Sequence, residues 1–335
     1  MPPYAGVVLL LTAAATLGRA ALDWSYCHGM APSAVANGSV VCPAGWHTRY
    51  PHCGGEVQQA PLNLAHGSVV VDTQLRPFDL NWVASQEMVF EAVHGVSLTA
   101  TPRDVKPALW DPNEGAAYAL QRVEFASPSL HAVGGGRRDL EVMFVHTRRG
   151  DDPATAAQLV VSLLFEASPV RPDHEALRAL AYPVVVDGAT SLNASQSHPQ
   201  RADFAAAAPL SRDYVTYDAA GAAPPCRRPT RYVVMQEVVG ASLEQVARIR
   251  AAMGLGARTV DGVERADGNV RPTQSPRGSA PPARRFVDYV GEHLFAAEPE
   301  APTVNKLVDD IAIAALALSC TGVVTALLAA RLSQA

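Results

Sequence analysis

The sequence predicts a mostly β protein with an apolar segment at each end. Several runs rich in β-branched and aromatic residues lie between Gly, Pro, Asp and Ser residues, whereas helix signals are sparse. The composition is 48% hydrophobic and 18% charged, which is too apolar for a disordered chain. The 335 residues leave room for one large domain or two ordinary ones.

Residues 1–20 are predicted to form a signal peptide. The stretch 5–18 has no charge, and the small residues of Gly18-Arg19-Ala20 suit cleavage near Ala20. The stretch is too short to cross a bilayer at about 1.5 Å per residue. A buried N-terminal helix is the alternative interpretation. A signal peptide would send the chain into the secretory pathway.

The other apolar segment, residues 311–330, is uncharged and close to the roughly 20 residues that cross a bilayer. We therefore predict a single C-terminal transmembrane helix over residues 309–330. Asp309 and Asp310 precede the apolar run and Arg331 follows it, so we expect the N-terminus outside and a cytoplasmic tail of residues 331–335. The expected location is a cell-surface or envelope membrane. A cleaved GPI signal is the competing interpretation.

Cysteines and glycosylation sequons suit an oxidising compartment. Cys27, Cys42, Cys53 and Cys226 lie in the predicted ectodomain, and Cys320 lies in the predicted span. Four cysteines suit two disulfides but allow three pairings. The sequons at Asn37 and Asn193 are candidate glycosylation sites.

The secondary structure between the two ends is predicted to be mainly strand. The predicted strands are residues 118–125, 140–146, 159–165, 182–186 and 232–235. The clearest helix follows Ser242, which is the expected N-cap, with Gln245 three residues later completing a capping box. A Pro-, Ser-, Gly- and Arg-rich stretch then begins a linker and stalk over 277–308. Within it, apolar residues at helical spacing predict a juxtamembrane helix over 284–297.

Six motifs between residues 22 and 274 resemble those of the α-carbonic anhydrases, in the same order. They are Trp24-Ser25-Tyr26, Tyr50-Pro51-His52-Cys53-Gly54-Gly55, Gln58-Gln59-Ala60-Pro61-Leu62-Asn63-Leu64, Arg212-Asp213-Tyr214-Val215-Thr216-Tyr217, Pro224-Pro225-Cys226 and Asn269-Val270-Arg271-Pro272-Thr273-Gln274. The resemblance implies that residues 21–276 form a domain with a large central, twisted, mainly antiparallel sheet and few short helices. It also implies disulfides, because secreted members join the positions of Cys53 and Cys226, which leaves Cys27 with Cys42.

The resemblance implies a zinc site formed by three histidines, two on alternate residues of one strand and one on the neighbouring strand. Aligning Tyr118 with the family's tyrosine places Glu124 and Ala126 at the first two positions. The run Glu141 to His146 resembles the family's Glu-Leu-His-Leu-Val-His and places Met143 at the third. Alanine has no ligand atom and a thioether binds zinc poorly. We therefore expect no zinc, no other cofactor and no enzymatic activity.

Other catalytic positions of the family are also changed. Ala222 stands where a threonine orients the zinc-bound hydroxide, and Leu130 stands where a glutamate accepts that threonine's proton. Glu87, or its neighbour Gln86, falls near the position of the proton-shuttle histidine. His131, His146 and Glu141 are expected to be paired polar residues of the core, although Glu141 could share the cavity with Glu124 and Arg122.

These observations favour a catalytically inactive ectodomain that binds an extracellular protein or a sulfated glycan. Candidate contacts for an anionic glycan are Arg137, Arg138, Arg148, Arg149, Arg227 and Arg228. The net charge of −5 gives no basic field for nucleic acid. One alternative is residual carbonic anhydrase activity, a zinc lyase with ligands from His131, His146 and Glu124. The other is an oligomeric structural surface protein, in which Gly322 and Ala326 allow close helix approach.

Overall fold

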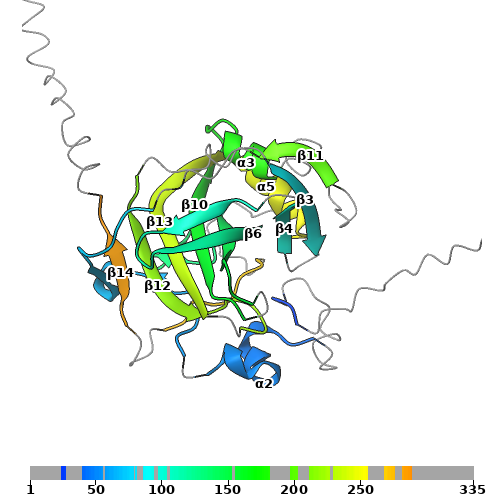
Figure 1. Cartoon of the computed structure of the whole chain (residues 1–335). Helices are drawn as coiled ribbons and strands as arrows, with labels where there is room; N and C mark the ends of the chain where they lie inside the picture. Colours follow the sequence, from blue (N-terminus) through cyan, green and yellow to red (C-terminus); the bar gives the residue numbers. More distant parts are fainter. Residues whose placement is uncertain are drawn as a thin grey trace, which may run out of the picture. The chain divides into compact units, whose positions relative to one another are not determined.

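A twisted β-sheet dominates the structure (Figure 1). The computed structural model describes residues 24–27, 40–55, 57–78, 80, 86–93, 97–103, 106–152, 155–181, 197–202, 211–226, 229–255, 268–275 and 281–288. Its strands are β1 (Asn63–Leu64), β2 (Val69–Val71), β3 (Gln86–Val93), β4 (Ser97–Pro102), β5 (Ala108–Asp111), β6 (Ala116–Ala126), β7 (Ala132–Val133), β8 (Gly136–Arg137), β9 (Leu140–Arg148), β10 (Gln158–Ser168), β11 (Ser197–Ala202), β12 (Tyr214–Ala220), β13 (Pro229–Ser242) and β14 (Ala283–Phe286). Its helices are α2 (Trp46–Arg49), α3 (Glu175–Leu180) and α5 (Leu243–Ala252), and its 3-10 turns are η1 (Pro43–Gly45), η2 (Pro51–Cys53) and η3 (His66–Ser68).

Strand pairing confirms the mostly β class, in the form of a mixed sheet. The large sheet has the order β11-β3-β4-β6-β9-β10-β13-β12-β14-β2, and β5 pairs with β6 beside this path. Its pairs are antiparallel except β10–β13 and β14–β2, which are parallel. A small second sheet has the order β1-β7-β8. The predicted strands over 118–125, 140–146, 159–165 and 232–235 lie in β6, β9, β10 and β13.

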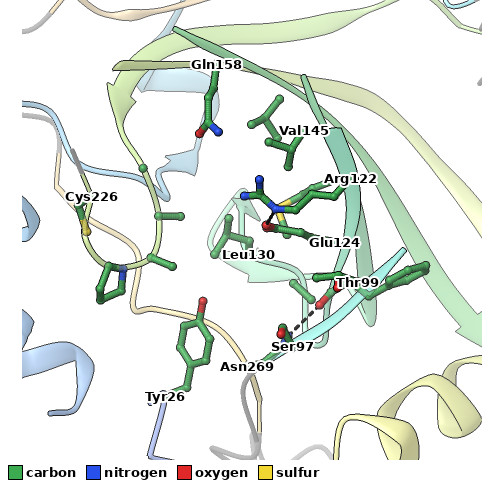
Figure 2. A pocket seen from close by; sticks show the side chains of 18 of the residues that line it. Tyr26, Ser97, Thr99, Arg122, Glu124, Leu130, Val145, Gln158, Cys226 and Asn269 are labelled. Atoms are coloured by element: carbon green, nitrogen blue, oxygen red, sulfur yellow. Dashed lines mark hydrogen bonds and ion pairs between the residues drawn. The ribbon is translucent and has the colours of Figure 1, made fainter. Parts of the chain in front are cut away.

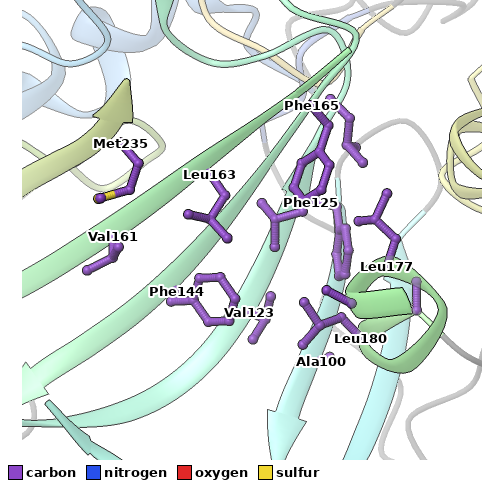
Figure 3. Close-up of a cluster of buried hydrophobic side chains, with 14 of the residues drawn as sticks. Ala100, Val123, Phe125, Phe144, Val161, Leu163, Phe165, Leu177, Leu180 and Met235 are labelled. Atoms are coloured by element: carbon purple, nitrogen blue, oxygen red, sulfur yellow. The ribbon is translucent and has the colours of Figure 1, made fainter. Parts of the chain in front are cut away.

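Central strands β9 and β10 are buried along most of their length, which explains their nearly continuous apolar sequences. On one face of the sheet, Phe125, Phe144 and Phe165 form a buried cluster with Leu177 and Leu180 of α3 (Figure 3). Burying each such side chain contributes about 1.5–3 kcal/mol. This cluster fixes β6, β9 and β10 side by side, so it also fixes the residues on their opposite face.

Helix α5 begins as predicted, but its expected capping box is incomplete. The hydroxyl of Ser242 accepts a hydrogen bond from the backbone N–H of Gln245 at 3.1 Å, which confirms the N-cap. The Gln245 amide, however, bonds the backbone N–H and carbonyl of His174 at 2.7 and 3.0 Å. The side chain of Gln245 thus bonds a tertiary partner in place of the local backbone N–H of Ser242. It links α5 to His174, the N-cap residue of α3.

The helix predicted over 284–297 is wrong at its start, because residues 283–286 form strand β14. This strand pairs with β12 and β2. The ring of Phe286 stacks on that of Tyr214, with 5.2 Å between the two ring centroids. Arg284 and Arg285 form ion pairs with Asp72 and Asp213 at 3.2 and 3.0 Å. Pairing to two strands thus overrides the helical spacing of the apolar residues. The domain consequently extends past the predicted boundary at residue 276.

Two disulfides join Cys53 to Cys226 and Cys27 to Cys42, the pairing that the family resemblance implies. The first bond connects residues 173 positions apart and holds the segment before β13 to the N-terminal turns. In the chain-entropy model, such a bond stabilises the fold mainly by restricting the unfolded state.

Several sequence predictions lie outside the described residues. They are the signal peptide 1–20, the strand 182–186, the remainder of the 277–308 linker and the segment 309–335 with its predicted span and Cys320. Within the described ranges, we find no helix that combines the length and apolarity needed to cross a membrane.

Candidate functional site

A pocket of about 580 Å³ lies on the sheet face opposite the phenylalanine cluster (Figure 2). Alternate residues of β6 direct Arg122, Glu124 and Ala126 toward it, whereas Val123 lies in the cluster. The neighbouring strands add Thr99 from β4, Val145 from β9 and Gln158 from β10, and the loop 221–226 forms another wall. The core packing therefore determines which side chains line the pocket.

All three predicted ligand positions meet in this pocket. Glu124 and Met143 are direct partners across β6 and β9, and Ala126 is two residues farther along β6. Their side chains offer one carboxylate, one thioether and no third donor. A catalytic zinc needs three protein ligands, so these residues do not fit it. The part of the chain that the structure describes holds no group of three His, Cys, Asp or Glu side chains arranged for a metal.

Two residues of this wall, Arg122 and Glu124, form an ion pair. The Nε of Arg122 donates to Oε1 of Glu124 at 2.5 Å. The neighbouring carboxylate raises the pKa of Arg122 above its ordinary value, so the guanidinium stays charged. The side chains of Arg122 and Glu124 are 37% and 31% exposed, so the pair borders the pocket and is not sealed in the core.

Two described residues of the pocket wall, Leu130 and Ala222, differ from the proton-moving groups that the family resemblance implies at their positions. Leu130 and Ala222 line the pocket as the alignment implies, and neither side chain can exchange a proton. The backbone N–H of Ala222 donates instead to the hydroxyl of Tyr232 at 3.0 Å. Burial, with the nearby charge of Glu124, raises the pKa of both Tyr232 and Tyr26 far above the ordinary value. Both phenols therefore remain protonated, and that of Tyr232 accepts the hydrogen bond from Ala222.

Glu141 does not share the cavity with Glu124 and Arg122, contrary to the alternative considered above. It is fully buried, and its two oxygens bond the backbone N–H and Nδ1 of His131 at 2.8 and 2.7 Å. Nε2 of His131 lies 2.6 Å from the hydroxyl of Tyr217. Burial favours a raised pKa for Glu141, but the charge and hydrogen bonds of His131 lower it below the ordinary value. The three side chains form a paired core network.

His146 is also a core residue. It is fully buried in β9, and its Nδ1 lies 3.2 Å from the carbonyl oxygen of Leu159. Burial lowers the pKa of His146 to about 4, so its ring is neutral at physiological pH. His131 and His146 therefore do not join Glu124 in a metal site.

The candidate arginine contacts differ in their surroundings. The guanidinium of Arg137 donates to the backbone carbonyls of Ser129, Leu130 and Arg271, so it joins loops of the fold. Arg138 lies 3.4 Å from Glu166, and Arg148 and Arg149 are exposed. The remaining predicted positions lie outside the described side chains: Arg227, Arg228, Asn37, Asn193 and Glu87, of which Glu87 has only its backbone described, in β3.

The sequence interpretation did not assign Tyr26, Gln158 or Tyr232 to the pocket. A signal existed for Gln158, because it precedes an apolar run and shares a strand face with Val160, which also lines the pocket. Tyr26 belongs to a family motif but is separated from β6 by about 100 residues in sequence. Only the folded chain brings these three side chains to one pocket, in which Figure 2 labels Tyr26 and Gln158.

Comparison with known proteins gives a family match over most of the chain. The family model described as eukaryotic-type carbonic anhydrase matches residues 41–279. Dioscorin DB3S of Dioscorea polystachya is 27% identical over 252 residues, which cover 75% of this chain and 83% of that protein. Alpha carbonic anhydrase 8 of Arabidopsis thaliana is 25% identical over 241 residues, 70% of this chain and 55% of that protein.

Solved structures share the same fold. The crystal structure of dioscorin complexed with ascorbate aligns with a TM-score of 0.62 at 24% identity, covering 79% of this chain and 98% of that one. The Photobacterium profundum alpha-carbonic anhydrase aligns with a TM-score of 0.58 at 22% identity, covering 78% of this chain and all of that one. At these identities the structural likeness concerns the fold alone.

Proposed function

Since the chain belongs to the eukaryotic-type carbonic anhydrase family, we propose that it is a catalytically inactive member that binds a partner instead of hydrating carbon dioxide. The observation that carries the proposal is the set of side chains at the three ligand positions. Glu124, Ala126 and Met143 line one pocket and supply at most one good zinc ligand. A zinc-bound hydroxide, which is the family's nucleophile, has no support there.

Changes elsewhere in the pocket support the same proposal. Leu130 and Ala222 replace the two groups that orient the hydroxide in the family. The backbone N–H of Ala222 bonds Tyr232, so a phenol lies near the position where the reaction would take place. Five positions of the pocket thus differ from the family, and one additional zinc ligand from elsewhere in the chain would not replace all of their roles.

The proposed setting is the outer face of a membrane. Two disulfides fit the oxidising secretory pathway. The apolar segments at 1–20 and 309–330 supply the proposed entry signal and anchor. The proposed partner is an extracellular protein or a sulfated glycan, and exposed Arg148 and Arg149 are the described residues best placed for sulfate.

Zinc analysis tests the loss of catalysis. The full-length chain is produced in a secretory host with zinc in the medium, and zinc is measured by mass spectrometry alongside stopped-flow hydration of carbon dioxide. We expect far less than one zinc per chain and a hydration rate equal to that of buffer. Stoichiometric zinc with accelerated hydration would contradict the proposal.

Binding to cells tests the partner. Labelled full-length chain is applied to cells before and after digestion with heparinase or chondroitinase, and in parallel after protease treatment. Loss of binding with either glycan-degrading enzyme identifies a sulfated glycan, and loss only with protease identifies a protein. Arg148→Gln with Arg149→Gln should weaken glycan binding, whereas Arg178→Gln with Arg248→Gln, which removes the same charge from two other exposed arginines, serves as the charge-matched control.

A further inference from the structure

We propose that the pocket bordered by Arg122 and Glu124 binds a neutral small molecule with neighbouring hydroxyl groups, such as the terminal unit of a saccharide or a free polyol. This inference rests on the proposed loss of the metal, because a cation on Glu124 would occupy its carboxylate. It adds a small-molecule site to the proposed partner contacts at Arg148 and Arg149, which do not line this pocket.

The ion pair itself provides matched donors and acceptors. The contact joins Nε of Arg122 to Oε1 of Glu124, so the terminal guanidinium nitrogens and Oε2 lie outside it. Both side chains keep about a third of their surface exposed beside the pocket. Of two neighbouring hydroxyls, one can accept from the guanidinium while the other donates to the carboxylate. Hydrogen bonds to charged groups are stronger than those between neutral groups.

Charge balance favours a neutral ligand. Among the described residues that line the pocket, Arg122 and Glu124 are the charged ones, and their charges cancel. A carboxylate ligand would compete with Glu124 for the guanidinium, and an amine would compete with Arg122 for the carboxylate. A hydroxyl compound adds hydrogen bonds to both side chains while leaving the pair joined.

Other groups of the pocket suit a polar ring with apolar faces. Figure 2 shows the amide of Gln158 and the hydroxyl of Tyr26 pointing into the pocket. The Gln158 amide can both donate and accept. Trp24 and Leu130 contribute apolar surface. The volume of about 580 Å³ lies within the roughly 300–1,000 Å³ of small-molecule sites, which combine apolar walls with a few placed polar groups.

Calorimetric titration of the full-length chain tests the inference. The probes are the methyl glycosides of glucose, galactose and mannose, with glycerol as a free polyol and acetate and bicarbonate as anions. We expect one-to-one binding of a glycoside or of glycerol, with a dissociation constant in the millimolar range or below. A glycoside that binds while glycerol does not identifies a saccharide terminus. The reverse result identifies a free polyol.

Substitutions locate the binding. Glu124→Gln should weaken the affinity at least about tenfold, because it removes a charged acceptor. Glu166→Gln changes a carboxylate of an exposed ion pair with Arg138 and should leave the affinity unchanged. Gln158→Leu, which retains a similar size, provides a second test if Glu124→Gln fails to fold, and it should also weaken binding.

Three results would overturn the inference: no binding by any glycoside or glycerol, tighter binding of acetate or bicarbonate, or equal affinity in the Glu124 and Gln158 variants. Zinc content of the same sample separates this outcome from failure of the proposed function. Zinc-free protein without glycoside or glycerol binding refutes only the ligand class. Stoichiometric zinc with hydration activity refutes the proposed function itself.

Discussion

Arg122 donates from Nε to Oε1 of Glu124 at 2.5 Å, and the family resemblance assigns Glu124 to the position of the first zinc-binding histidine. At this position the pocket is faced by two charged side chains of the protein, where the family has a zinc ligand. Because the two residues are i and i+2 on β6, they share one face of the strand and can form this contact without any change in the sheet. The pair gives this wall of the pocket a polar surface without net charge.

The ion pair should contribute little to stability, since both side chains are about a third exposed. We expect Arg122→Met to lower the free energy of unfolding by about 1 kcal/mol or less. A double-mutant cycle with Glu124→Gln, measured by urea unfolding, should give a coupling energy of roughly 0.5–1 kcal/mol. Purely additive effects would indicate that the pair does not form in solution.

The buried pair of His131 and Glu141 should matter far more. His131→Phe removes both ring hydrogen bonds and leaves the Glu141 carboxylate without its partner ring in the core. We expect a loss of about 3–5 kcal/mol in unfolding free energy, which is typical of a buried ion pair that loses one member. The measurement is the urea midpoint, with Glu166→Gln at the surface as the control. A loss below about 1 kcal/mol would contradict the pairing.

Much of the fold could be predicted, because the signals were local or came from ordered motifs. Strand runs such as 159–165 are apolar on both faces, and the Ser242 N-cap is a local hydrogen bond. Strand β14 could not be read in this way, because its conformation depends on β12 and β2, which are distant in sequence. The apolar spacing over 284–297 predicts a helix because a local pattern carries no information about those partners.

The pocket, too, could be predicted only in part from the sequence. The alignment predicts Glu124, Ala126 and Met143 as neighbours, since the family motifs fix the register of two strands. The contact of Ala222 with Tyr232 and the approach of Tyr26 arise from tertiary packing, for which no local pattern exists. The sequence allows two surroundings for Glu141, and the structure selects the one in which burial is matched by His131.

Stability should depend on pH through His146. Burial lowers the pKa of His146 from 6.5 to about 4 in the folded chain. Between these values the unfolded chain binds the proton and the folded chain does not, so stability is retained above about pH 6.5 and lost as pH falls toward 4. The loss should approach about 1.4 kcal/mol per pH unit, or roughly 3 kcal/mol over the interval.

His146→Gln isolates this contribution from that of the carboxylates. The glutamine amide can still donate to the carbonyl of Leu159, but it does not titrate. Unfolding free energies of both proteins are compared from pH 7 to pH 4. As pH falls, the unfolding free energy of the wild-type chain should decrease more than that of the variant. Parallel curves would show that His146 keeps an ordinary pKa.

The two disulfides should differ in their effect on stability. In the chain-entropy model, the bond closing 173 residues contributes about 5 kcal/mol and the bond closing 15 residues about 3 kcal/mol. Replacing Cys53 and Cys226 by serine should therefore lower the unfolding midpoint more than replacing Cys27 and Cys42. The two double variants are compared by urea unfolding under identical oxidising conditions, and the opposite ranking would contradict the entropic account.

Restoring three histidines should rebuild a metal site, because the sheet still places the three positions together. Glu124 and Met143 are direct cross-strand partners and Ala126 shares the face of Glu124. We expect the triple variant Glu124→His, Ala126→His, Met143→His to bind one zinc per chain, measured by mass spectrometry after dialysis. The double variant that keeps Met143 should bind at least about tenfold more weakly, since a zinc centre of this kind needs three protein ligands.

Arg122 should limit the affinity of the rebuilt site. Once Glu124 is replaced, the guanidinium has lost its carboxylate and stands near a divalent cation, so the like charges repel. Adding Arg122→Gln to the triple variant should therefore tighten zinc binding, whereas Arg138→Gln at the surface should not. Carbon dioxide hydration should remain weak in both, because Leu130 and Ala222 still cannot orient a hydroxide. If the triple variant binds no zinc, the three positions do not converge, and the assignment of the pocket to the family's metal centre is wrong.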